Sequence, residues 1–197
     1  MELRRVCVFC GSSLGARPDY LDVARALGVE LAERGIGLVY GGAHVGLMGA
    51  LADTCRLAGG EVTGVIPSPL VDAEVAHTGL DDLRVVGTMH ERKALMADLA
   101  DGFVALPGGF GTLEEFSEVV TWSQLGLHPT PKPCGLLDVA GFYAPLVEWF
   151  DGAAEQGFIR PQHRELVLVD TRPGPLLDAL AAWQAPPPTR KWVDWQR

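Results

Sequence analysis

Residues 106–121 combine a glycine-rich turn with a helix start, a pattern typical of an anion-binding loop. They read Leu-Pro-Gly-Gly-Phe-Gly-Thr-Leu-Glu-Glu-Phe-Ser-Glu-Val-Val-Thr and directly follow the apolar run 103–105. Glycine lets the main chain approach a ligand closely, and Pro107 ends the strand. The helix expected from Thr112 turns unpaired N–H groups and its positive dipole end toward the loop. We expect the bound anion to be a phosphate.

Glu115 has two interpretations at this stage. As an acid one turn into the helix it could face the ligand. Thr112-Leu113-Glu114-Glu115 is also a capping box, in which Thr112 caps the helix and Glu115 bonds back to the Thr112 backbone N–H. Spacing alone leaves both roles open.

Arg92 is a second candidate for chemistry. In the helix expected over 89–100 it shares the spacing of Leu95, Met96 and Leu99, which places it on the apolar face. None of the positions three or four residues away holds an acid for an intrahelical ion pair. The guanidinium either reaches water along apolar surface or points at an anion, and the adjacent Lys93 could serve the same site.

Several other site classes lack their motifs. The turn 41–46 is Gly-Gly-x-x-x-Gly rather than a dinucleotide fingerprint, there is no P-loop, and Ser12 lies in no hydrolase elbow. The five histidines have no metal-ligand spacing. We therefore expect neither a metal nor a cofactor.

Composition narrows the class of partner. The chain has 197 residues, 48% hydrophobic content and a formal net charge of -9, which argues against nucleic acid or a membrane surface as partner. No apolar run reaches the ~18 residues of a membrane span, and no signal peptide is evident. Cys7, Cys10, Cys55 and Cys134 lie in apolar segments, as reduced buried thiols do. A cytoplasmic protein is expected.

The order of the elements predicts an α/β fold. Short apolar strands alternate with amphipathic helices, which is typical of a Rossmann-like, doubly wound, mostly parallel sheet of about seven strands with helices on both faces. Residues 1–185 are expected to form this single domain, and residues 186–197 a tail with prolines and tryptophans. Strands are expected over 5–10, 36–40, 62–66, 83–86, 103–106, 134–138 and 166–169. The glycine turns after the first, second and fifth strands should therefore share one edge, where ligands bind.

Two motifs taken together resemble the Lonely Guy (LOG) family of cytokinin-activating phosphoribohydrolases. They are Met-His-Glu-Arg-Lys at 89–93 and Pro-Gly-Gly-Phe-Gly-Thr-Leu-Glu-Glu at 107–115, and the likeness extends over most of the chain. The resemblance implies hydrolysis of the N-glycosidic bond of AMP or an N6-substituted AMP, giving free base and ribose 5-phosphate. It also implies a homodimer with sites near the subunit interface.

The resemblance assigns Arg92 and Glu115 as the catalytic pair. It further implies nucleotide-binding positions, which are Glu74, Arg92, Lys93, Gly108, Gly109, Phe110, Gly111, Thr112, Leu113, Glu114, Glu115 and Thr121. Phe110 stands where many relatives have tyrosine, and the segment around Glu74 departs from the family pattern, so base preference stays open.

One alternative to this function is disfavoured by the sequence, and a second one stays open. The "lysine decarboxylase" label often given to such sequences is disfavoured, because the chemistry needs a Schiff-base lysine and the only lysines are Lys93, Lys132 and Lys191. A carrier similar to the molybdenum-cofactor carriers would bind a nucleotide or cofactor without turnover.

Overall fold

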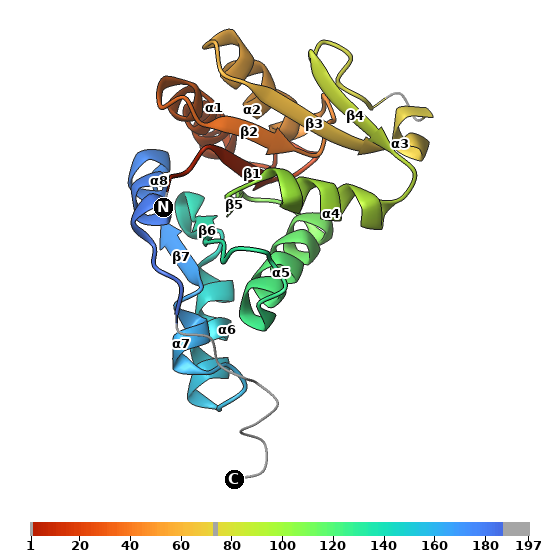
Figure 1. The fold of residues 1–197 in the computed structure, drawn as a ribbon. Helices are drawn as coiled ribbons and strands as arrows, with labels where there is room; N and C mark the ends of the chain where they lie inside the picture. Colours follow the sequence, from red (N-terminus) through yellow and green to blue (C-terminus); the bar gives the residue numbers. More distant parts are fainter. Residues whose placement is uncertain (1, 73–74, 187–197) are drawn as a thin grey trace.

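The computed structural model describes residues 2–72 and 75–186. In this part of the chain, seven strands form one sheet, and every pair of neighbours runs parallel (Figure 1). The order across the sheet is β4-β3-β2-β1-β5-β6-β7. The strands are β1 (Arg5–Phe9), β2 (Gly37–Tyr40), β3 (Val62–Pro67), β4 (Asp82–Val86), β5 (Gly102–Ala105), β6 (Cys134–Leu137) and β7 (Val167–Asp170). The predicted parallel α/β sheet is confirmed.

Helices cover both faces of the sheet. They are α1 (Pro18–Glu33), α2 (Gly46–Leu57), α3 (Ser68–Asp72), α4 (Met89–Leu99), α5 (Phe110–Leu125), the 3-10 turn η1 (Val139–Gly141), α6 (Ala144–Glu155), α7 (Pro161–Arg164) and α8 (Pro173–Ala182). One hydrophobic cluster joins α1, α2 and α8 to the sheet, and a second joins α4, α5 and α6 to the opposite face. Figure 1 shows α4 and α5 lying next to each other on that second face.

Side chains along β1 point alternately to the two faces of the sheet, so this strand contributes to both hydrophobic clusters. Val6 and Val8 pack with the first cluster, whereas Cys7 and Phe9 pack with the second. Cys10, just beyond the strand, returns to the first cluster. The sequence Cys-x-x-Cys therefore places its two thiols on opposite faces of the sheet. All four cysteines are free and buried.

The chain reverses its direction across the sheet at β1. It runs outward from β1 through β2 and β3 to β4, then returns through α4 to β5 on the other side of β1. A reversal of this kind leaves a crevice at the carboxyl ends of the two strands, here β1 and β5, and ligands of doubly wound folds bind there. The turns that follow β1 and β5 are two of the three glycine turns.

Some boundaries differ from those expected. Helix α5 begins at Phe110 with Gly109 as its N-cap, so Thr112 lies inside the first turn and caps nothing. The connection after β3 contains the short helix α3, and the short helix α7 follows α6; neither is among the elements expected from the sequence. The tail beyond Pro186 lies outside the described residues. None of the helices described here has the length and apolar character to cross a membrane.

Candidate active site

The three glycine turns interlock at the carboxyl edge of the sheet. The Gly11 N–H after β1 donates to the Pro107 carbonyl after β5 at 3.0 Å, and the Leu47 N–H at the start of α2 donates to the Gly11 carbonyl at 3.1 Å. Gly46 has φ +58°, and a Cβ there would overlap the backbone of Ser12. The predicted meeting of the turns is confirmed, and main chain rather than side chains forms the floor of the site.

The start of α5 projects from this floor. A Cβ built on Gly109 or on Gly111 meets no atom within 4 Å, so both glycines border open space. Gly108 is enclosed instead, because a Cβ there would overlap the hydroxyl of the buried Thr112. Unpaired amides of a helix start beside two open glycines are suited to an anion.

Arg92 reaches the site from α4. Thr88 caps this helix by accepting a hydrogen bond from the Glu91 N–H at 3.2 Å, and the Glu91 carboxylate accepts one from the Gly87 N–H at 2.8 Å. The Arg92 side chain runs inward and is only 8% exposed. Its Nε donates to the Val65 carbonyl at 3.1 Å. The alternative in which the guanidinium head reaches water is therefore wrong.

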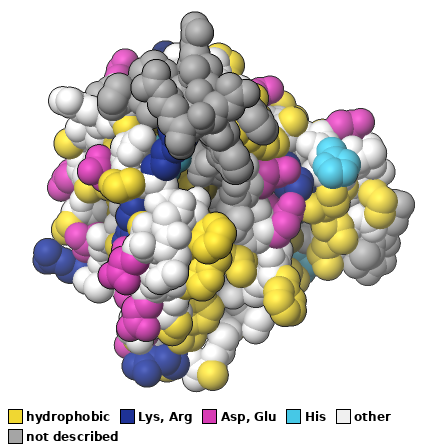
Figure 2. Space-filling view, turned by 90° about the horizontal axis from the view of Figure 1, so that it is seen from below, with side chains coloured by type: hydrophobic (Ala, Val, Ile, Leu, Met, Phe, Trp, Pro, Cys, Tyr) yellow, Lys and Arg dark blue, Asp and Glu magenta, His cyan; other side chains and the backbone are white. Residues whose placement is uncertain are grey.

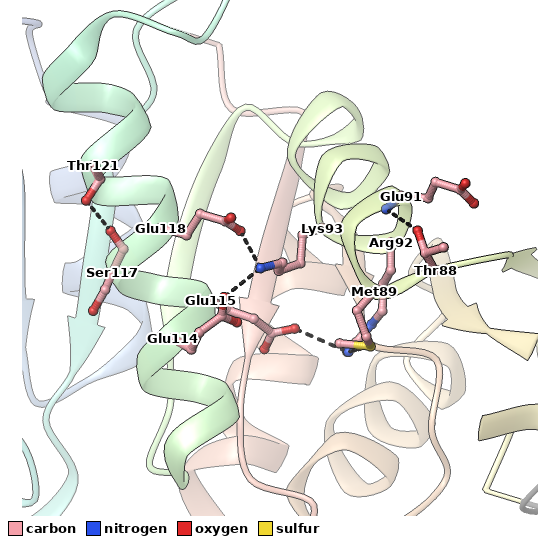
Figure 3. A network of polar contacts seen from close by, with 10 residues as sticks. All are labelled: Thr88, Met89, Glu91, Arg92, Lys93, Glu114, Glu115, Ser117, Glu118 and Thr121. Carbon is pink, nitrogen blue, oxygen red and sulfur yellow. Dashed lines mark hydrogen bonds and ion pairs between the residues drawn. The ribbon is translucent and has the colours of Figure 1, made fainter. Parts of the chain in front are cut away.

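The guanidinium faces Glu115 across the two helices (Figure 3). Arg92 Nη2 lies 3.3 Å from Glu115 Oε1, and Glu115 is itself 8% exposed. Burial raises the pKa of Glu115 above its ordinary value, and the charge of Arg92 opposes that rise. Glu115 Oε1 accepts no hydrogen bond from any described residue. The carboxylate is thus held by charge and keeps acceptor capacity for a ligand.

The capping box is corrected by this geometry. Thr112 is not the N-cap of α5, and the helix has no side-chain hydrogen bond at its cap. The Glu115 side chain turns toward α4 rather than back along its own helix.

Lys93 forms a second contact between α4 and α5. Its Nζ lies 2.5 Å from Glu114 Oε1 and 3.1 Å from Glu118 Oε2 (Figure 3). Burial alone would lower the pKa of Lys93, but the two carboxylates outweigh this and raise it. The lysine is 9% exposed. We call Arg92, Lys93, Glu114, Glu115 and Glu118 the α4–α5 cluster.

Other expected site residues lie apart from this cluster. Phe110 is 94% exposed at the start of α5, and Leu113 is 41% exposed one turn on. Thr121 is exposed farther along the helix, where its hydroxyl donates to the Ser117 carbonyl at 2.8 Å (Figure 3). Glu74 lies outside the described residues.

The residues that follow Glu74 attach to the turn after β2. The His77 N–H donates to the Gly42 carbonyl at 2.8 Å, and the His44 N–H donates to the Val75 carbonyl at 3.0 Å. The buried His77 ring also lies 3.2 Å from Asp53 on α2. This end of the connection between β3 and β4 therefore borders the edge where the glycine turns meet.

Two contributors to the site were missed at the sequence level. Gly41 matters because a Cβ there would overlap Arg92 Nη2. Glu118 matters because it holds Lys93. A signal for the second was present: Glu114 and Glu118 are four residues apart on a helix, a spacing at which like charges repel unless a cation lies opposite.

The described lysines do not suit Schiff-base chemistry. Lys93 is paired with two carboxylates, and Lys132 is buried and donates to the Ala97 carbonyl at 2.7 Å. Lys191 lies outside the described residues. Within residues 2–72 and 75–186 no group of three or more His, Cys, Asp or Glu side chains is arranged to hold a metal ion.

Comparisons with known proteins agree on one family. A family model described as "Possible lysine decarboxylase" matches residues 48–180. The protein of Oryza sativa subsp. japonica named probable cytokinin riboside 5′-monophosphate phosphoribohydrolase LOGL9 is 55% identical over 84% of this chain and 72% of its own length. The rice protein named cytokinin riboside 5′-monophosphate phosphoribohydrolase LOG is 51% identical over 85% of this chain and 68% of its own.

A solved structure with a similar fold is the molybdenum cofactor carrier protein of Chlamydomonas reinhardtii. It superposes with a TM-score of 0.67 and 24% identity, covering 92% of this chain and 96% of the carrier. At that identity the similarity concerns the fold alone.

Proposed function

Because the chain belongs to the family of the cytokinin riboside 5′-monophosphate phosphoribohydrolases, we propose that it hydrolyses the N-glycosidic bond of N6-substituted AMP and of AMP itself. The products are the free base and ribose 5-phosphate. The observation that carries this proposal is the buried pair of Arg92 and Glu115 beside an open helix start, at the crevice between β1 and β5.

The nucleotide's phosphate binds at the start of α5. Gly109 and Gly111 leave space there, and the helix dipole favours a dianion. The bound phosphate positions the ribose without involving the bond that breaks, so the binding energy of the phosphate serves to orient the substrate. The proposed nucleotide-binding residues are Glu74, Arg92, Gly108, Gly109, Phe110, Gly111, Thr112, Leu113, Glu114, Glu115 and Thr121. The family resemblance adds Lys93 to this set, but its two carboxylate partners favour a supporting role.

Glu115 acts at the sugar. As the C1′–N9 bond breaks, its electron pair leaves with the base and positive charge develops on the ribose ring. The ionised carboxylate stabilises that charge and accepts a proton from the water that adds to C1′. That proton then passes to the departing base, which returns Glu115 to its ionised form. Its unused acceptor capacity in a buried position supports this role.

Arg92 acts on the carboxylate and on the leaving group. Its charge favours the ionised form of Glu115 against the effect of burial. The Nε contact to Val65 and the Nη2 contact to Glu115 fix the guanidinium plane and leave other N–H groups for the departing base or the phosphate.

Product analysis with Glu115→Gln tests the proposal. The wild-type protein is incubated with AMP and with isopentenyladenosine monophosphate, and free base is measured by chromatography. We expect base from the wild type, and at least a 100-fold lower rate from Glu115→Gln with AMP binding retained in calorimetry. Glu155→Gln, at an exposed position on α6, is the matched control and should keep full turnover. Undiminished turnover in Glu115→Gln would overturn the assignment.

The carrier alternative is decided by the same assay. Binding of AMP without any free base, from either nucleotide, would favour a carrier. The similarity to the molybdenum cofactor carrier gives it no residue-level support, since that comparison reaches only 24% identity.

The proposal includes a homodimer in the cytoplasm. Large apolar side chains are exposed on α5 and just after it, namely Phe110, Leu113, Leu125 and Leu127. Figure 2 shows hydrophobic side chains gathered in the middle of the face seen from below. A second subunit over such surface would remove it from water. Light scattering at two protein concentrations tests the dimer, and localisation of a tagged protein tests the compartment.

A further inference from the structure

Glu118 is an acid that the reaction described above does not use. It lies on α5 one turn after Glu114, its side chain is 25% exposed, and Oε2 lies 3.1 Å from Lys93 Nζ. That oxygen accepts no hydrogen bond from the described residues beyond this ionic contact. A buried carboxylate oxygen is costly unless a charge compensates it, and here the compensating charge is Lys93.

Lys93 has little capacity left for a nucleotide. Its ammonium is nearly buried and already lies between two carboxylates, Glu114 and Glu118, both from α5. Arg92, the adjacent residue on α4, makes the ion pair with Glu115, which lies between those two acids on α5. The ion pair of Arg92 and those of Lys93 therefore join the same two helices, α4 and α5, side by side (Figure 3).

We propose that Glu118 is a positioning residue for the reaction: together with Glu114 it holds Lys93, and this tie keeps α4 against α5 so that Arg92 and Glu115 remain paired. This inference rests on the proposed function of the Arg92–Glu115 pair. It assigns Lys93 to the support of the catalytic pair rather than to the substrate, and it adds a residue to the site that the family resemblance did not supply.

The tie also sets the charge around Glu115. The charged groups that act on Glu115 are Arg92 and Lys93 from α4, which favour its ionised form, and Glu114 and Glu118 from its own helix, which oppose it. On the sheet side lie the buried thiols of Cys7 in β1 and of Cys10 just beyond it, and burial raises the pKa of both, which keeps them neutral. Removing Glu118 and removing Lys93 should therefore change the ionisation of Glu115 in opposite directions.

The pH dependence of kcat/KM for AMP tests this in three variants. Glu118→Gln keeps an acceptor for Lys93, so kcat should stay within about threefold of wild type while the acidic limb moves to lower pH. Lys93→Met should move that limb to higher pH and lower kcat at least tenfold, with KM for AMP changed less than threefold. Glu118→Ala should lower kcat at least tenfold, and its difference from the Gln variant measures the positioning role. Glu155→Gln is the control for loss of one acid.

Two results would overturn the inference. One is a raised KM with unchanged kcat in Lys93→Met, which would place the ammonium on the substrate. The other is a wild-type pH profile and kcat in both Glu118 variants. A purely structural role would lower the yield of folded protein without opposite shifts of the limb.

A carboxyl titration separates this inference from the proposed function. The ¹³C shift of the Glu115 carboxyl is followed against pH in the wild type, in Glu118→Gln and in Lys93→Met, and no turnover is needed. Failure of the wild type to release base would overturn the function alone. Equal titration midpoints in all three proteins would overturn the role of Glu118 alone.

Discussion

The guanidinium of Arg92 occupies the space that a side chain on Gly41 would need. A Cβ on Gly41 would overlap Arg92 Nη2 and lie 3.2 Å from Met48 Sδ. Because Gly41, in the turn after β2, has no side chain, the guanidinium of Arg92 can lie against this turn and reach Glu115.

Gly41→Ala should displace the guanidinium while the fold persists. Shifts of about 1 Å at a catalytic group cost on the order of 100-fold in rate, so we expect kcat for AMP to fall about that much. The urea midpoint should change little, because the overlap is with the end of a flexible side chain. Gly152→Ala on α6, whose Cβ meets no atom within 4 Å, is the matched control and should retain wild-type kcat.

Gly111→Ala should separate binding from stability. Its Cβ meets no protein atom within 4 Å, and alanine suits a helix better than glycine, so stability should be unchanged or raised by up to about 1 kcal/mol. If phosphate lies against this turn, the methyl group obstructs it, and KM for AMP should rise at least tenfold. A lower KM or an unchanged one would move the phosphate elsewhere. Calorimetric affinity for AMP gives the same comparison without turnover.

The raised pKa of Glu115 predicts a shifted pH profile. Burial is the main cause and Arg92 the main opposing influence, so the acidic limb of kcat/KM should lie above the ordinary glutamate value of about 4.3. A limb at or below that value would contradict the geometry of the pair.

The same shift has a consequence for stability. A carboxyl group whose pKa is raised by folding stabilises the fold most below its unfolded pKa, and this contribution is lost as pH rises through the folded value. The free energy of unfolding of the wild type minus that of Glu115→Gln should therefore decrease between pH 4 and pH 7. Urea titrations at both pH values measure it.

Gly28→Ala should weaken the contact between α1 and α2. A Cβ on Gly28 would lie 2.7 Å from the Leu51 carbonyl oxygen and 3.0 Å from the Cys55 nitrogen, both backbone atoms of α2. Overpacking against backbone costs about 1–3 kcal/mol, which exceeds the gain of about 1 kcal/mol from replacing glycine in a helix. We expect a lower urea midpoint, whereas Gly152→Ala, free of such contact, should be neutral or stabilising.

The sheet and its functional edge could be predicted from sequence because they depend on local signals. Short apolar strands separated by amphipathic helices specify a parallel sheet, and parallel strands bring the turns that follow them to one edge. The position of Arg92 on an apolar helix face was likewise enough to separate it from solvent-facing residues, and its burial follows from that.

Contacts between helices could not be predicted from the spacing of residues in the sequence. The capping box at 112–115 is a frequent local match, and tertiary pairing of Glu115 with Arg92 prevailed over it. The start of α5 was placed at Thr112 because Gly109 was treated as part of the turn, yet Gly109 is the N-cap. The contact of Lys93 with Glu114 and Glu118 was likewise not evident from the sequence. The contacts of Glu115 and of Lys93 depend on how α4 lies against α5, which no local spacing encodes.

The hydrogen bonds that join Gly11 to Pro107 and Leu47 to Gly11 bear on the order in which the protein assembles. The first of them connects a segment near the beginning of the chain with one past its midpoint, so it forms only after β5 has been inserted beside β1. Contacts between such distant segments form slowly, since a large loop must close first. A nascent chain that has left the ribosome only as far as α4 carries Arg92 but lacks its acidic partner. Nucleotide binding should therefore arise among the final events of folding, and a stalled chain of that length should capture no AMP.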